Sequence, residues 1–70
     1  MTAASRVATF VVARDQGMWE VWRGDVLLHF DRSLDRTIRR ARLMARSHAP
    51  AVIVLRAADG TDMHREKIDL

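Results

Sequence analysis

Residues 7–30 read VATFVVARDQGMWEVWRGDVLLHF, and this stretch decides the fold. Its β-branched and aromatic residues fall into three runs, separated by a turn at 14–17 and by Gly24 and Asp25. Short apolar runs with turn residues between them predict strands joined by hairpins. We therefore expect three strands, at 7–13, 18–23 and 26–30.

The two loops also decide which residues share a face of the sheet, because side chains alternate along a strand. With 14–17 and Gly24-Asp25 as the loops, Val12 is expected opposite Trp19, and Trp19 opposite Phe30. One face then collects the expected core: Phe10, Val12, Trp19, Val21, Leu28 and Phe30. The other face collects a second, largely apolar group: Thr9, Val11, Glu20, Trp22, Leu27 and His29.

The segment from Ser33 to Pro50 has the residue spacing of an amphipathic helix. Ser33 is suited to cap the N-terminus and Pro50 to follow the C-terminus, so the helix is expected from Leu34 to about His48. One side of this helix is apolar or small, which suits packing on a sheet. The opposite side carries a group of arginines that is a candidate for polyanion binding: Arg36, Arg39, Arg40, Arg42 and Arg46.

Two further strands are expected at 51–56 and 61–67, joined by a turn at Ala58-Asp59-Gly60. A right-handed crossover through the helix would place strand 51–56 parallel to the first strand and beside it. The predicted fold is α+β, a single βββαββ domain over residues 7–68. Its one mainly antiparallel sheet has the strand order 3-2-1-4-5, with the helix packed on one face. Met1–Arg6 is expected to be a mobile leader.

Composition narrows the functional classes. The 12 basic and 9 acidic residues leave a net charge of +3, which predicts a mild field. Cysteine is absent and the three histidines are far apart in the sequence, so we expect no metal site and no cofactor. The three glycines are isolated turn residues rather than a phosphate loop, and no catalytic constellation is evident, so we expect neither an enzyme nor a small-molecule substrate. No segment reaches the ~18 apolar residues of a membrane span, and we expect a cytoplasmic, bacterial protein.

Several structural motifs lie along the chain: a Gly-x-Trp-x-Val hairpin, a Ser-capped Ala-rich helix and a final Asp-Gly turn. They include Trp19-Glu20-Val21, Phe30, Ser33, Ala41-Arg42, Ala45, Val52-Ile53-Val54 and Asp59-Gly60. In these motifs the chain resembles a small, widespread bacterial family of unknown function. The resemblance implies the fold and carries no activity across, because the motifs are structural.

The chain departs from that family at the start of the helix. The family often has an acidic residue three positions after the cap and then alanine, whereas this chain has Arg36 and Thr37. A reciprocal capping box is therefore lost, and a cation is placed at the positive end of the helix dipole. This departure favours a use for Arg36.

The first half alone also resembles the three-stranded DNA-binding domains of phage integrases and plant ethylene-response factors. In those domains the sheet face opposite the helix enters the major groove. The corresponding face here is expected to be short of cations, so the resemblance does not favour DNA contact.

Two surfaces remain as candidates for function. Val11, Trp22, Leu27 and His29 form an apolar surface that a second copy could cover, so we expect a binding or assembly module that forms a homodimer. The alternative is that the leader or the C-terminal segment covers this surface.

The arginine group predicts a different function, nucleic-acid binding through the helix. A solvated helix face in an arginine-rich proteome explains the same residues. An acidic protein is a further possible partner for them.

Overall fold

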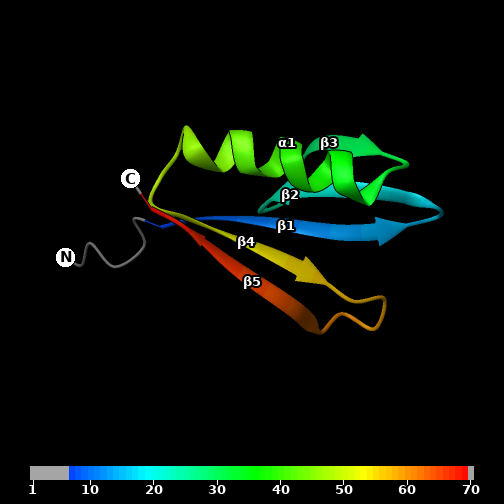
Figure 1. Ribbon diagram of the computed structural model, residues 1–70. Helices are drawn as coiled ribbons and strands as arrows, with labels where there is room; N and C mark the ends of the chain where they lie inside the picture. Colours follow the sequence, from blue (N-terminus) through cyan, green and yellow to red (C-terminus); the bar gives the residue numbers. More distant parts are fainter. Residues whose placement is uncertain (1–6, 70) are drawn as a thin grey trace.

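The computed structural model describes residues 7–69, which form one sheet with a helix on one face (Figure 1). The elements are β1 (Ala8–Asp15), β2 (Met18–Arg23), β3 (Val26–Asp31), α1 (Leu34–Arg46), β4 (Ala51–Arg56) and β5 (Asp62–Ile68). The strand order is β3-β2-β1-β4-β5; β1 and β4 are parallel, and the other neighbouring pairs are antiparallel. The predicted fold class and strand order are confirmed. The expected leader, Met1–Arg6, lies outside the described residues.

The core lies between α1 and the sheet face beneath it, which we call the covered face. Phe10 and Val12 of β1, Val21 of β2 and Ile53 of β4 are buried there. The parallel register of β1 and β4 sets Phe10 beside Ile53. Ile53 is β-branched, and such a side chain packs well on a pleated surface, which is why the central strands are rich in these residues.

Small side chains let α1 lie close to the sheet. Ala41 and Ala45 are fully buried, as is Thr37 one turn earlier. The hydroxyl of Thr37 donates a hydrogen bond to the carbonyl oxygen of Ser33 at 2.8 Å, so its burial leaves no unpaired polar atom. Ser33 is the N-cap, as predicted, and its side chain accepts a hydrogen bond from the backbone N–H of Arg36.

The first hairpin has a shorter loop than expected. Only Gln16 and Gly17 form it, both with positive φ (49° and 81°), and β1 extends to Asp15. Val12 therefore lies opposite Val21, two positions away from the predicted partner, Trp19. A shift of two residues preserves the alternation, so the predicted faces of β1 and β2 remain correct.

The second hairpin corrects the predicted core. Its register agrees with the prediction as far as Trp22 opposite Leu27, and then shifts so that Val21 lies opposite His29 and Glu20 opposite Phe30. This is a β-bulge with one extra residue on β3, and every later side chain on that strand changes face. Phe30, expected in the core, is 60% exposed on the sheet face opposite α1. Leu28, also expected in the core, is exposed.

Between residues 7 and 69, the chain forms no helix that has both the length and the apolar character needed to cross a membrane. The one helix, α1, has 13 residues and a charged outer side.

Candidate interaction surfaces

The five arginines proposed for polyanion binding all lie on α1, but three of them form ion pairs with carboxylates. The guanidinium of Arg36 donates three hydrogen bonds to the carboxylate of Asp31, at 2.9–3.2 Å. Arg39 pairs with Asp35 one turn earlier on the helix. Arg42 donates to both carboxylate oxygens of Glu66 on β5, at 2.9–3.2 Å. The arginine side of α1 is therefore less cationic than its sequence suggests.

The direction of the pKa shifts agrees with these pairings. The hydrogen bonds from Arg36, followed by the backbone N–H of Ser33, lower the pKa of Asp31 to about 2. The hydrogen bonds from Arg42 lower the pKa of Glu66, and in return Glu66 raises the pKa of Arg42. Both pairs are therefore fully ionised near neutral pH. Within residues 7–69, Arg32, Arg40 and Arg46 have no carboxylate within ion-pairing distance.

Arg36 has a structural use that explains the departure at the start of the helix. Asp31 accepts the backbone N–H of Ser33 at 2.7 Å and is held in place by Arg36. In a capping box, a carboxylate at the position of Arg36 would accept that same N–H. Here the carboxylate comes from Asp31, two residues before the cap, and Arg36 orients it. The expected use of Arg36 in ligand binding is not needed to explain its presence.

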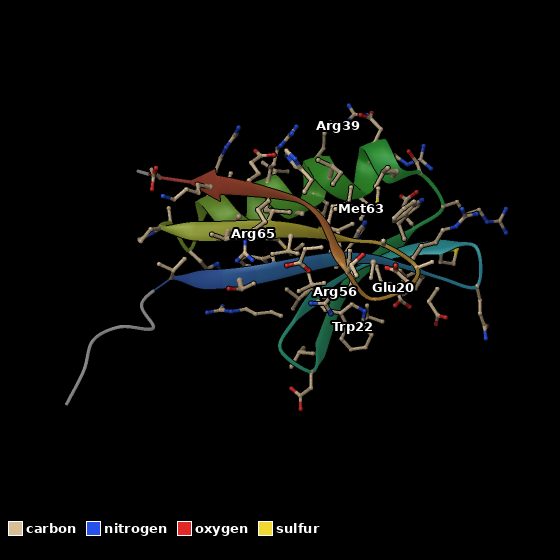
Figure 2. The ribbon with its side chains drawn as sticks, turned by 90° about the horizontal axis from the view of Figure 1, so that it is seen from below. Glu20, Trp22, Arg39, Arg56, Met63 and Arg65 are labelled. Carbon is tan, nitrogen blue, oxygen red and sulfur yellow. The ribbon has the colours of Figure 1, made fainter. Side chains whose placement is uncertain are left out.

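The sheet face opposite α1, which we call the open face, carries an apolar row. The strand registers align Leu27, Trp22, Val11 and Val54 across β3, β2, β1 and β4. Val54 is buried, Val11 and Trp22 are half-buried, and Leu27 is exposed. The indole N–H of Trp22 donates to Glu20 at 2.9 Å, which fixes the ring orientation on this face. Figure 2 views this side and shows Glu20 and Trp22 next to each other.

His29 does not belong to this surface, although the sequence placed it there. The bulge turns it to the covered face, where it lines a shallow hollow beside α1 with Asp31, Arg36 and Leu43 among others. Phe30 takes its place on the open face. We therefore define the apolar strip as Val11, Trp22, Leu27 and Phe30.

The open face also carries cations that the sequence analysis missed. Arg56 of β4 and Arg65 of β5 lie on the same side as Trp22 (Figure 2), and the register places Lys67 there as well. Asp62 offsets part of this charge, because it pairs with Arg56 at 3.8 Å and with Arg65 at 3.3 Å. Alternation along 51–56 and 62–68, combined with the predicted strand order, is the sequence signal that could locate these cations. The open face is thus mainly apolar from β3 to Val54 of β4 and charged over β5 and at Arg56, the last residue of β4.

Neither a metal cluster nor a deep cavity is found in the part of the chain that the structure describes. No group of three or more His, Cys, Asp or Glu residues within 7–69 could hold a metal ion. One surface hollow, of about 250 Å³, is lined by residues 27–30 of the edge strand β3.

Comparisons of this chain with protein-family models, with curated proteins and with solved structures find no match. The resemblance to the bacterial family rests on its motifs alone.

Proposed function

We propose that this chain is a small binding or assembly module that self-associates into a homodimer through the open face. The observation that carries the proposal is the apolar strip, which no helix or strand of residues 7–69 covers. Its most exposed member, Phe30, is an aromatic side chain of the kind that interface cores favour. As in the sequence analysis, we place the protein in the cytoplasm.

The distribution of charge on the open face fits packing against a second copy. Over β1, β2 and β3 the apolar strip can meet its own copy about a two-fold axis. Arg56, Arg65 and Lys67 would then lie outside the apolar centre, as a polar rim. Full burial of a large apolar side chain such as Phe30 or Leu27 stabilises by about 1.5–3 kcal/mol. Burial of the apolar strip can therefore offset a substantial part of the free-energy cost of association.

A domain of this size also benefits from a partner. A core built by 70 residues without disulfides gives roughly 3–5 kcal/mol of stability. Association adds to the apparent stability, and the gain rises with protein concentration. The proposal therefore predicts that the melting temperature rises between about 5 and about 200 µM protein.

Light scattering coupled to size-exclusion chromatography tests the proposal. We expect the wild type to elute as a dimer or a larger assembly at about 200 µM and Trp22→Lys to have a lower mass, because a buried lysine would face the apolar strip of the second copy. Met63→Lys, an exposed apolar residue replaced on the distant strand β5, is the matched control and should have the mass of the wild type. A monomeric wild type at this concentration would exclude the proposed function.

A second measurement does not depend on a substitution at the interface. In Trp19→Phe the indole of Trp22 is the only tryptophan of the chain, so its emission reports on the open face. We expect the emission to shift to shorter wavelength as the protein concentration rises, since association removes water from the ring. Emission that does not change while the mass doubles would place the contact elsewhere.

A further inference from the structure

The two edges of the sheet differ in their chemistry. β3 and β5 are the edge strands, so each exposes a row of backbone N–H and C=O groups without a strand partner within residues 7–69. β5 is protected by charge, with Asp62, Arg65, Glu66 and Lys67 along it. From Val26 to Phe30, β3 carries no acidic residue, lysine or arginine.

The β3 edge is also unusually apolar for an exposed strand. Four of its side chains are between 39% and 60% exposed: Val26, Leu27, Leu28 and Phe30. α1 contacts β3 on the covered face, and no strand of residues 7–69 lies beside its outer edge. An exposed apolar edge strand is a template for pairing with another strand. Leu28 is the extra residue of the bulge and has no residue opposite it on β2.

Charged residues on either side of the apolar run of β3 favour one direction of pairing with a second copy. Asp25 precedes the apolar run and Arg32 follows it, and neither has an ion pair within residues 7–69. Asp31 is already held by Arg36. In an antiparallel pairing of β3 with itself, Asp25 of each copy approaches Arg32 of the other, and the two-fold axis forms this contact twice. A parallel pairing would bring like charges together.

We propose that β3 pairs antiparallel with β3 of a second copy, joining two five-stranded sheets into one continuous sheet. This contact goes beyond the proposed function, because it uses a strand edge rather than the open face. An axis perpendicular to the sheet keeps each face on its own side, so the two open faces lie side by side. The two apolar strips then form one wider surface that is still available for packing.

Leu28→Lys tests the pairing, with Met63→Lys as its matched control. Both substitutions place a lysine at an exposed apolar position of an edge strand, 40% exposed on β3 and 65% exposed on β5. Lysine on an edge opposes strand pairing, so we expect the dissociation constant of the β3 contact to rise by about 10-fold or more in Leu28→Lys. Met63→Lys should behave as the wild type. An unchanged assembly in Leu28→Lys overturns the inference.

A charge exchange tests the direction of the strands. Asp25→Arg and Arg32→Asp each place like charges together across the antiparallel contact, so each should weaken association by about 2- to 5-fold at low salt. The double variant restores opposite charges and should return association to the level of the wild type. A double variant as weak as the single variants overturns the antiparallel pairing.

The results separate this inference from the proposed function. Association that is sensitive to Leu28→Lys and insensitive to Trp22→Lys supports the edge contact and excludes the open-face contact. The reverse pattern keeps the open-face dimer and overturns the edge contact. If both contacts form, each single variant lowers the mass and the combined variant is a monomer. Circular dichroism at low concentration establishes that each variant is folded.

Discussion

Phe10 and Phe30 carry the same side chain on opposite faces of one sheet. Phe10 lies on β1 beneath α1 and is 1% exposed, whereas Phe30 lies on β3 and is 60% exposed. Alternation along the sequence predicts both on one face. The difference between them shows that the identity of a side chain does not decide its role; the register of its strand does.

The largest expected effect is a difference in the free energy of unfolding between variants in which each phenylalanine is replaced separately. Phe10→Ala should lower the free energy of unfolding by about 3–5 kcal/mol, because it opens a cavity among Val12, Ile53 and Ala45. That loss is comparable to the whole stability expected of so small a domain. Phe30→Ala should change the free energy of unfolding of the monomer by about 0.5 kcal/mol or less.

Urea unfolding followed by circular dichroism checks this pair at a concentration low enough to suppress association. Phe10→Leu, a smaller change, provides a measurable value if Phe10→Ala does not fold. Similar losses for Phe10→Ala and Phe30→Ala would mean that Phe30 is buried in the monomer, and the assignment of the two faces would be wrong.

Part of the sheet, but not the side chains after the bulge in β3, could be predicted from the sequence. The strands, their order and the faces of β1 and β2 followed from alternation and from the handedness of crossovers, so Phe10, Val12 and Val21 were assigned correctly. The predicted first loop was two residues too long, and a shift of two residues keeps every side chain on its predicted face. The bulge in β3 was not predicted; it shifts the register by one residue, so His29 and Phe30 lie on the faces opposite to those predicted.

The bulge could not be read from the sequence, because residues 26–30 contain no glycine or proline that would mark it. The ion pairs of α1 were missed for another reason. Glu66 is 24 residues from Arg42 along the chain, so their contact depends on the placement of β5 beside β4. Asp31 is only five residues from Arg36, but it lies beyond the expected end of the third strand at Phe30, after the bulge that changes the faces of His29 and Phe30.

A smaller effect on stability is expected at the start of the helix, where Asp31 accepts the N–H of Ser33 and pairs with Arg36 of α1. The pKa of Asp31 is lowered to about 2 in the folded protein, against about 3.9 in an unfolded chain. Its contribution to stability is therefore fully present above about pH 5 and is lost as the pH falls from about 4 to about 2. Asp31→Asn cannot make the charged contact with Arg36 and should be less stable than the wild type at neutral pH.

The difference between the two proteins is the informative quantity, because Glu66 and Asp59 also have lowered pKa values and titrate in both. Thermal unfolding of the wild type and of Asp31→Asn at several pH values should show the difference in melting temperature shrinking towards about pH 2. A difference that stays constant over this range would assign the effect of the substitution to packing instead of charge.

The smallest expected effect concerns the arginines of α1, where the same residue type is again used in two ways. Arg36 and Arg42 are held by carboxylates, whereas Arg40 and Arg46 have no such partner within residues 7–69. Replacing a paired arginine and replacing an unpaired one lower the local net charge by the same amount, because each removes one guanidinium. Only the unpaired arginines, however, can contact a phosphate without first giving up an ion pair.

We therefore expect at most weak binding to single-stranded nucleic acid, within the non-specific range of about 10⁻⁴–10⁻⁶ M. At about 50 mM salt, Arg40→Ala with Arg46→Ala should weaken that binding and reduce its salt slope by about 1 to 2, one phosphate contact per arginine. Asp31→Asn with Glu66→Gln should have the opposite effect, because it releases Arg36 and Arg42 from their carboxylates. Fluorescence anisotropy over a range of salt concentrations measures both. Binding that is unaffected when Arg36 and Arg42 are released would show that the ion pairs do not limit contact with phosphate, and the arginines would then act only as a solvated helix surface.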